Sequence, residues 1–311
     1  MAAHAFEDWI GRERIMEDTV TLDRARKLAA TLDLDPDVPR NGGPLPHGWH
    51  WIYFHEAVPR SALADDGHER RGDFLPPIPL ARRMWAGGRL RFGRALRIGT
   101  RVRRVSTVRS VELKQGRSGS LAFVTVEHSL SDEAGVVLEE EQELVYLDRI
   151  AEGRGGRPGG ARKSSDAEAA VPDWTEPCSL DEVALFRFSA LTFNGHRIHY
   201  DRPYAVEVEH YPDLVVHGPL LALVLLGAGG RWADALTGRP AAGQPVSFTY
   251  RALQPVFCNE SIDLCGVASH GSASEHALGL WAAHATRGVV TRAELVIEDP
   301  RSRPPFRASE P

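Results

Sequence analysis

Two histidines and an asparagine lie within six residues in the second half of this 311-residue chain. The segment 188–201 reads FSALTFNGHRIHYD and contains Asn194, His196 and His199, with His217 shortly after it. Imidazole is the side chain whose unperturbed pKa lies close to neutral pH, so it exchanges protons readily. The Asn-Gly pair is typical of a turn, which places these side chains on a loop. The segment is therefore a candidate site for proton transfer.

Most of these residues also have a structural interpretation. Asn194 could simply form the Asn-Gly turn, and His196 could orient the loop by hydrogen bonding. Asp201 is expected to cap the short segment that begins at Arg202. His196 and His199 could approach one zinc ion, but no HExxH or CxxC motif and no third ligand completes the set. We therefore expect no metal.

The bulk composition is that of an ordinary globular protein, with 42% hydrophobic and 25% charged residues. A formal net charge of −5 argues against a nucleic-acid partner, because such partners are bound largely by neutralising phosphates. Three cysteines without a CxxC pair favour a reducing compartment. The sequence shows neither a secretory signal nor an apolar run near the ~20 residues of a membrane span. We expect a soluble, cytoplasmic protein without a membrane partner.

A stretch at 151–172 divides the chain into an N-terminal half, 1–150, and a C-terminal half, 173–311. The stretch is rich in Gly, Ala, Arg and Ser and lacks aromatic residues, which is the composition of a flexible linker. The triplet Arg-Ala-Leu occurs in both halves, at 94–96 and 251–253. The first copy begins an expected strand that ends before a turn at Gly99-Thr100, and a turn is also expected after the second copy, at Asn259-Glu260. A second weak similarity joins QELVY at 142–146 to AELVI at 293–297, further along each half. We interpret the two halves as a tandem duplication.

Apolar patterning predicts one long helix and a set of strands. Segment 219–236 begins with proline and is apolar on every face over its first eight residues, so a buried helix is predicted there. Its Gly227, Gly229 and Gly230 would allow a sheet to approach closely. Alternation and β-branched residues predict strands, and the clearest are 121–128, 136–147, 247–252, 262–269 and 289–298. Strands that follow a helix in each half favour an antiparallel sheet in an α+β layout.

The histidine-rich segment and the YPDLVVHGPLLALVLL that follows it resemble the MaoC-like hydratase and dehydratase family. The resemblance is to the branch that contains 3-methylfumaryl-CoA (mesaconyl-C4-CoA) hydratases and hydroxyacyl-thioester dehydratases. GWHWIYF at 48–54 and the segment 72–92 are similar to the same branch. The resemblance implies a double hot-dog fold, with an antiparallel sheet around a central helix in each repeat. It also implies a non-catalytic, tunnel-shaping repeat at 1–150 and a catalytic repeat at 173–311.

The resemblance also implies roles for individual residues. The family loop carries an aspartate, an asparagine two residues later and a histidine three residues after that. Aligned on His199, these positions hold Asn194 and His196 in this chain. Because asparagine cannot accept a proton, we expect His199 to act as acid and base, with His196 or Asn194 assisting at the substrate or water. Gly218 would present its backbone N–H to the enolate oxygen, although it could also serve close packing alone.

Ten arginines and no acidic residue lie between Arg82 and Arg109. A solvated sheet face explains such a run as well as an anion-binding surface does. On the second interpretation, Arg82 or Arg83 would hold the free carboxylate of a dicarboxylic acyl-CoA, and Trp85 would contact the substrate. No cofactor is expected apart from the CoA or acyl-carrier protein that carries the acyl group.

The leading expectation is a hydro-lyase that reversibly hydrates an enoyl thioester, with 3-methylfumaryl-CoA giving citramalyl-CoA as the specific reaction. A fatty-acid-type hydroxyacyl-ACP or -CoA dehydratase and a hot-dog thioesterase remain alternatives. So does a non-catalytic subunit that binds acyl thioesters. The sequence leaves open whether the partner is a small acyl-CoA or an acyl-carrier protein, and whether the chain forms a homodimer.

Overall fold

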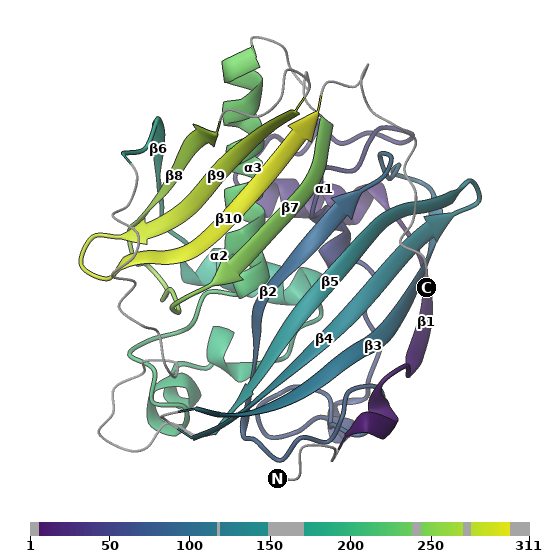
Figure 1. Cartoon of the computed structure of the whole chain (residues 1–311), viewed down its shortest axis with the longest axis vertical. Helices are drawn as coiled ribbons and strands as arrows, with labels where there is room; N and C mark the ends of the chain where they lie inside the picture. Colours follow the sequence, from purple (N-terminus) through teal and green to yellow (C-terminus); the bar gives the residue numbers. More distant parts are fainter. Residues whose placement is uncertain (1–5, 117–118, 149–170, 238–243, 270–274, 299–311) are drawn as a thin grey trace.

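Ten strands form one antiparallel sheet in the computed structural model, which describes residues 6–116, 119–148, 171–237, 244–269 and 275–298. The N-terminal half contributes β1 (Glu13–Thr19), β2 (Arg82–Phe92), β3 (Arg101–Gly116), β4 (Gly119–Asp132) and β5 (Gly135–Leu147). The C-terminal half contributes β6 (Trp174–Cys178), β7 (Gln244–Ala252), β8 (Ile262–Ser269), β9 (Glu275–His284) and β10 (Gly288–Glu298). The order β1-β3-β4-β5-β2-β7-β10-β9-β8-β6 reads the same from both edges when each strand is exchanged for its counterpart (Figure 1). This is the order that a duplicated five-stranded unit predicts.

The five strands named as the clearest in the sequence are all present. In β4, buried and partly exposed residues alternate along most of the strand, which is the period-2 pattern of a sheet with one face on a core. β2 and β7 pair antiparallel at the centre and join the two halves into one continuous sheet. A register shift between Trp85 and Gly87 interrupts the pairing of β2 with β5. Such irregularities redirect side chains, and this one lies next to the cavity described below.

The strand expected just before the first turn, at 94–98, is absent. These residues make only an isolated bridge, between Arg97 and Pro44, and the C-terminal half has a corresponding isolated bridge between Phe257 and Val215. The bridges are 160 residues apart (257 − 97), whereas the Arg-Ala-Leu triplets are 157 apart (251 − 94). The triplets therefore do not occupy equivalent positions. The mirror order of the strands, and not this echo, supports the interpretation of a duplication.

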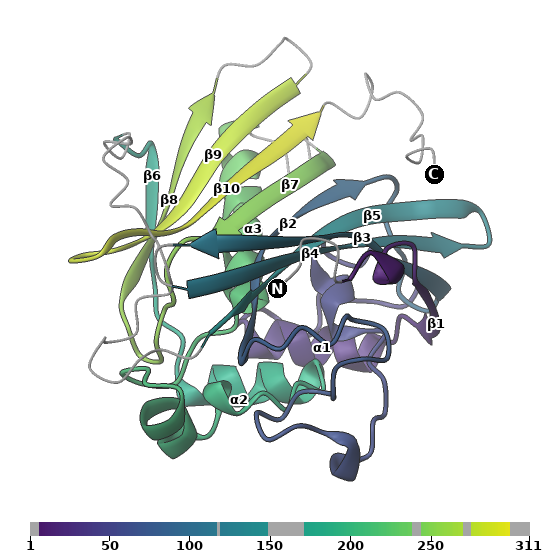
Figure 2. The ribbon, with the colours of Figure 1, turned by 60° about the horizontal axis from the view of Figure 1, so that its bottom comes forward.

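Three helices lie on one side of the sheet. α1 (Leu22–Thr31) and α2 (Glu182–Leu191) lie side by side there, as Figure 2 shows. α3 (Gly218–Thr237) is the predicted apolar helix, and its Leu220, Leu225 and Ala228 are fully buried. A Cβ on Gly229 would lie 2.5 Å from the Leu280 side chain of β9, so this glycine does allow the sheet to approach. The other two helix glycines have no sheet atom that close.

The N-terminal half has no counterpart of α3. Residues 44–81, in the corresponding place in the chain, contain only the short 3-10 helices Trp49–Ile52 and Arg60–Ala62. The central helix expected in each repeat is thus present in the second repeat and replaced by a long loop in the first. Prolines break helical pairing, and this stretch is rich in them: Pro44, Pro46, Pro59, Pro76, Pro77 and Pro79. Removal of one central helix leaves room between the halves.

Two expectations concern particular segments of the chain. The proposed linker at 151–172 falls, except for its last two residues, outside the described residues. Within the described part of the chain, no helix, α3 included, combines the length and the apolar character needed to cross a membrane.

Candidate active site

A cavity of about 2100 Å³ lies between the two halves of the molecule. Its wall is formed by the loop that follows α2, the first turn of α3, the start of β2 and the long loop 53–81. The residues expected from the sequence that line it are Asn194, His196, His199, Gly218, Arg83 and Trp85. Arg82 is not among the lining residues. The structure thus brings six of the seven expected residues to one cavity.

His199 is buried, and its ring is held in a defined tautomer. Its Nδ1 lies 2.7 Å from the Val215 carbonyl oxygen, which can only accept a hydrogen bond, so Nδ1 carries the proton. The remaining nitrogen, Nε2, is then a free base in a residue that lines the cavity. Burial lowers the pKa of His199 from 6.5 to about 4. His199 is therefore neutral, and able to accept a proton, throughout the physiological pH range.

His217 fixes the plane of the His199 ring. The two rings are stacked, with centroids 3.7 Å apart and planes 18° apart. His217 Nε2 lies 2.8 Å from the Ser189 hydroxyl on α2, which anchors the stack to the helix. Burial, and then the neighbouring His199, hold the pKa of His217 well below its usual 6.5. The pair is thus a preorganised, uncharged base rather than an ion pair.

Asn194 forms the turn that its sequence suggests. Its Oδ1 accepts a hydrogen bond from the His196 backbone N–H at 3.0 Å. The His196 ring is presented by this turn and lies edge-on to His199, with centroids 5.3 Å apart. Burial, and then the neighbouring imidazoles of His68 and His199, which disfavour a further positive charge, keep the pKa of His196 well below 6.5. Asn194 therefore positions His196, and its carbonyl oxygen is already engaged.

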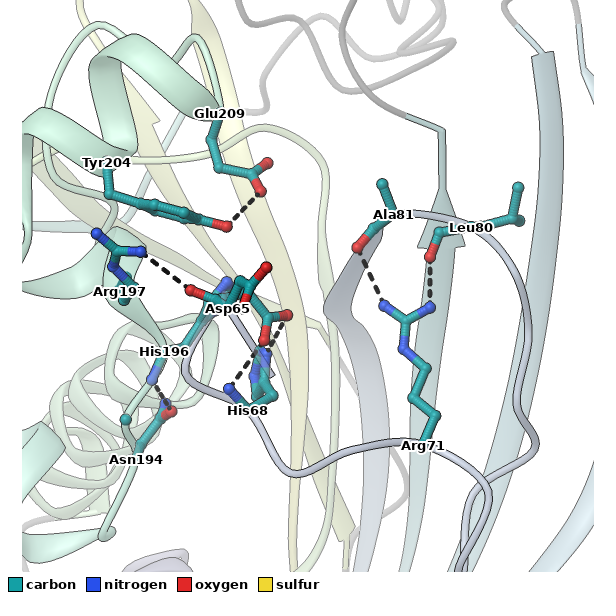
Figure 3. A network of polar contacts seen from close by, with 12 residues as sticks. Asp65, His68, Arg71, Leu80, Ala81, Asn194, His196, Arg197, Tyr204 and Glu209 are labelled. Atoms are coloured by element: carbon teal, nitrogen blue, oxygen red, sulfur yellow. Dashed lines mark hydrogen bonds and ion pairs between the residues drawn. The ribbon is translucent and has the colours of Figure 1, made fainter. Parts of the chain in front are cut away.

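A loop of the N-terminal half, residues 63–69, packs directly on this turn. The Arg197 N–H donates to the Asp66 carbonyl oxygen at 2.9 Å, and Arg197 Nη1 donates to the Asp65 carbonyl oxygen at 3.1 Å. Figure 3 shows the contact, with His68 beside His196. The His68 and His196 ring centroids are 4.0 Å apart. The N-terminal half therefore contributes a fourth histidine to the cluster.

His68 is paired with a carboxylate. Its Nδ1 lies 3.0 Å from Asp66 Oδ2, and Asp66 Oδ1 accepts from the His68 backbone N–H at 2.9 Å. Burial and the charge of Arg83 lower the pKa of His68 to about 4, while that of Asp66 falls to about 2 because its hydrogen bonds and ion pairing outweigh its burial. At neutral pH the pair is thus a carboxylate and a neutral imidazole.

Gly218 is the first residue of α3 and lies against β2. The first intrahelical bond runs from Leu221 N–H to the His217 carbonyl oxygen at 3.1 Å, so the Gly218 amide precedes the helical ladder. A Cβ on Gly218 would lie 3.5 Å from the Trp85 carbonyl oxygen, an ordinary contact. The Trp85 ring packs edge-on against Trp51 at 5.3 Å. A helix N-terminus thus opens into the cavity, where it can stabilise negative charge on an oxygen.

The two candidate arginines point to different places. Arg82 is buried and donates to the Asp148 carbonyl oxygen at 3.0 Å and to the Tyr211 hydroxyl at 3.2 Å. Its expected contact with substrate is therefore not supported. Neighbouring residues of a strand face opposite sides, and Arg83 lines the cavity. No described carboxylate lies within ion-pair distance of Arg83.

The rest of the arginine run serves the sheet. Cross-strand ion pairs join Arg91 to Glu139 at 2.6 Å and, at shorter separations, Arg109 to Glu127. Arg101 pairs in the same way with Glu17, and Arg94, just after β2, pairs with Asp132 of β4. All ten arginines are described, and Arg83 alone lines the cavity. Ion pairs thus involve four of the ten arginines, and Arg82, Arg97 and Arg104 donate to backbone carbonyl oxygens. Arg83 is available for an anion.

A second pair of basic residues lies elsewhere in the cavity wall. Arg251 of β7 and Arg292 of β10 are direct cross-strand partners, and both line the cavity. Like charges opposite each other destabilise a sheet unless an anion offsets them. Within the described residues, neither guanidinium has a carboxylate partner. Sequence reasoning did not single out this pair, because strand register was needed to bring the two together.

The structure groups a different set of potential metal ligands from the one weighed in the sequence. Asp66, His68 and His196 each offer an atom within 4.8 Å of the other two. Asp66 and His68 are already hydrogen-bonded to each other, and the planes of the His68 and His196 rings are tilted by 37° with centroids 4.0 Å apart. An ion would have to displace these contacts. A hydrogen-bonded dyad accounts for the arrangement, so the expectation of no metal stays a prediction.

Sequence reasoning missed Asp66 and His68. A signal was present, because Asp66-Gly67-His68 repeats the Asx-Gly-His pattern of Asn194-Gly195-His196. In both turns the side-chain oxygen of the first residue accepts the backbone N–H of the histidine. The two turns were not connected because they lie 128 residues apart (194 − 66) and their packing depends on the tertiary fold.

This chain is similar to known proteins in both sequence and structure. Residues 48–258 match the family described as hydroxyacyl-thioester dehydratase type 2. The chain is 45% identical over 249 residues to the mesaconyl-C(4)-CoA hydratase of Chloroflexus aurantiacus, which covers 80% of this chain and 84% of that protein.

Solved structures show the same fold at low sequence identity. One described as a MaoC-like dehydratase has a TM-score of 0.68 and 16% identity, and the match covers 94% of this chain and 99% of the other. A conserved protein of Mycobacterium tuberculosis described as a double hot dog has a TM-score of 0.54 and 14% identity over 94% and 97% of the two chains. The expected double hot-dog fold is thus confirmed, and the chain belongs to the hydroxyacyl-thioester dehydratase type 2 family.

Proposed function

We propose that this protein is a hydro-lyase that reversibly adds water across the 2,3-double bond of an enoyl thioester. The observation that carries the proposal is the neutral, oriented imidazole of His199, placed in the same cavity as the N-terminus of α3. Family membership and the similarity to a mesaconyl-C(4)-CoA hydratase support the same chemistry.

The geometry supports a simple sequence of proton movements. The His199 Nε2 takes a proton from water as the water oxygen forms a bond to C3. The electron pair of the double bond then moves toward the thioester carbonyl, whose oxygen becomes negative. The backbone N–H of Gly218 stabilises this oxygen, an effect typically worth about 3 kcal/mol. The His199 imidazolium finally gives its proton to C2, which restores the neutral imidazole.

The acyl group that fits this cavity best carries a second carboxylate. Arg83 lines the cavity without a described carboxylate partner, and its charge lowers the pKa of both His68 and His196. A guanidinium in that position suits a carboxylate, which it can bind through two parallel hydrogen bonds. In 3-methylfumaryl-CoA the free carboxylate is bonded to C3, the carbon that water attacks. It must therefore lie close to the base, and Arg83 lines the same cavity as His199. We propose 3-methylfumaryl-CoA as substrate and citramalyl-CoA as product.

The carrier of the acyl group is proposed to be CoA itself. Arg251 and Arg292 form a like-charged pair in the cavity wall that a phosphate would stabilise. CoA carries a diphosphate at the 5′ position of its ribose and a phosphate at the 3′ position. An acyl-carrier protein presents only one phosphodiester, at the serine that holds its arm. Two adjacent arginines without a carboxylate partner among the described residues therefore favour the free cofactor thioester.

Purified protein incubated separately with 3-methylfumaryl-CoA and crotonyl-CoA tests the proposal. We expect the enoyl absorbance to disappear without release of free thiol, and faster for the dicarboxylic substrate. Release of thiol would instead identify a thioesterase. Binding without any change in either signal would identify a non-catalytic subunit. Either of these two outcomes would contradict the proposed hydration.

A further inference from the structure

The carboxylate–imidazole pair of the N-terminal half is not used in the mechanism above. Asp66 and His68 lie on the 63–69 loop, which packs on the turn that presents His196. Four described histidines form the cluster, and their rings differ in hydrogen bonding. His199 donates to a carbonyl and His217 contacts a hydroxyl, whereas His68 alone contacts a carboxylate. The ring of His196 has no hydrogen-bond partner among the described residues.

The Asp66 carboxylate determines which nitrogen of His68 is basic. An ionised carboxylate only accepts hydrogen bonds, so Nδ1 of His68 must carry the proton. Nε2 then holds a lone pair, and it belongs to a residue of the cavity wall. The charges near this ring are the carboxylate of Asp66 and the guanidinium groups of Arg83 and Arg71, with the neutral His196 beside it. At neutral pH, His68 is thus a residue of the cavity wall whose Nε2 can accept a hydrogen bond.

A hydrating site needs two acceptors if the water is to be oriented. Water has two O–H groups, and the carbon to be attacked must face a lone pair of its oxygen. His199 Nε2 accepts one O–H and removes that proton. The second proton stays on the oxygen and becomes part of the product hydroxyl. An acceptor for the second O–H would fix the rotation of the water about the first hydrogen bond.

We propose that Asp66 and His68 form a water-orienting dyad, in which His68 Nε2 accepts the second O–H of the attacking water and Asp66 holds His68 in the required tautomer. This inference rests on the proposed hydratase function. No proton is transferred to His68 in the step, so the balance of atoms and charge is that already given. In the dehydration direction the same nitrogen accepts from the hydroxyl that leaves. The N-terminal repeat would then take part in catalysis and not only shape the tunnel.

Asp66→Asn is the sharpest test, because the chain itself shows that the turn tolerates asparagine. Asn194 makes the equivalent turn in the C-terminal half. Its Oδ1 accepts the backbone N–H of His196, just as Asp66 Oδ1 accepts that of His68. In the variant, the amide NH₂ would face His68 Nδ1 and force the proton onto Nε2. His68 would then donate into the cavity and could no longer accept from water. We expect kcat to fall by about 10²-fold with KM and thermal stability unchanged.

His68→Asn provides an independent variant, since its amide can still donate to Asp66 while the acceptor nitrogen is lost. We expect the same fall in kcat, and no further fall when the two changes are combined. Asp65→Asn is the matched control. Asp65 is exposed, and only its backbone carbonyl contacts the histidine-rich turn. Its kcat should equal that of the original chain.

A spectroscopic readout separates tautomer control from simple structural support. The ¹⁵N shifts of the His68 ring should report Nδ1–H in the original chain and Nε2–H in Asp66→Asn. If the original chain hydrates its substrate but both variants keep kcat within threefold, the dyad is contradicted and the hydratase function stands. If the original chain hydrates no enoyl thioester, the function itself fails. Activity that a chelator removes and Zn²⁺ restores would also overturn the dyad, because the same side chains would then be metal ligands.

Discussion

Gly67 of the N-terminal half lies so close to Gly195 of the C-terminal half that a Cβ on Gly67 would be 1.8 Å from the Gly195 carbonyl oxygen. Gly67 also has a φ of +88°, in the left-handed region that favours glycine. Its neighbours Asp66 and His68 face the cluster from this contact. The histidine-rich turn and the N-terminal loop therefore form one site only when the two halves pack together.

Gly67→Ala should displace this loop from the histidine-rich turn. The added methyl meets a backbone oxygen that cannot move without moving Asn194 and His196. We expect kcat to fall at least tenfold and the melting temperature to drop by several degrees, about what 1–3 kcal/mol of destabilisation produces. Gly72→Ala is the control, since Gly72 has a φ of +102° but its Cβ would have an ordinary 3.7 Å contact. If Gly67→Ala and Gly72→Ala lose the same activity, the effect comes from backbone strain and not from the contact between the two loops.

Arg83→Gln should change specificity more than turnover. Loss of hydrogen bonds to a charged group costs about 1.5–3 kcal/mol, so KM for 3-methylfumaryl-CoA should rise about 10- to 100-fold. Crotonyl-CoA has no second carboxylate, and its kinetics should change little. Arg89→Gln is a suitable control, because Arg89 lies on the same strand but is exposed and outside the cavity wall. A similar rise in KM for both substrates would show that Arg83 does not bind the carboxylate.

Replacing Arg251 and Arg292 by serine should weaken the binding of the carrier. We expect KM for the CoA thioester to rise about tenfold or more, with kcat preserved. The corresponding pantetheine thioester, which lacks the nucleotide phosphates, should be processed equally by both proteins. The unaltered chain should also lose affinity for the CoA thioester as salt is raised, since screening weakens phosphate contacts. An unchanged KM for CoA in the double variant would leave an acyl-carrier protein as the better candidate.

The pH profile should reflect the depressed pKa of His199. The base is active when neutral, and its pKa is lowered from 6.5 to about 4 by burial. The ratio kcat/KM should therefore stay level from about pH 8 down to about pH 5 and fall only as the pH approaches 4. Short assays from protein kept at neutral pH separate titration from acid unfolding. An acid limb centred at 6.5 would mean that the catalytic base is a solvated histidine.

The sequence revealed the C-terminal part of the site because its signals are local. The Asn-Gly turn, the spacing of His196 and His199 and the apolar run after Gly218 all lie within about forty residues. Each pattern determines a turn or helix largely by itself, and both elements are found where they were expected. The apolar character of α3 also indicated correctly that the helix is enclosed by protein.

The remaining features depend on contacts between distant segments. The choice between Arg82 and Arg83 depends on the face and register of β2, which the irregularity after Trp85 changes. The replacement of the first central helix by a loop could have been suspected from its prolines, but the packing of that loop on the C-terminal half could not. The sequence repeats the Asx-Gly-His pattern at His68, but only the tertiary contact shows that His68 belongs to the site.

The central claim is that His199 is the acid and base of a hydration reaction. His199→Ala tests it, with hydration of 3-methylfumaryl-CoA as the signal and binding of the saturated analogue as a check on the fold of the site. His276→Ala, at an exposed position on β9, is the control. We predict that kcat falls by about 10²- to 10⁴-fold in His199→Ala while analogue binding and the control are unaffected. A His199→Ala protein that binds the analogue and hydrates the substrate within threefold of the normal rate would contradict the account.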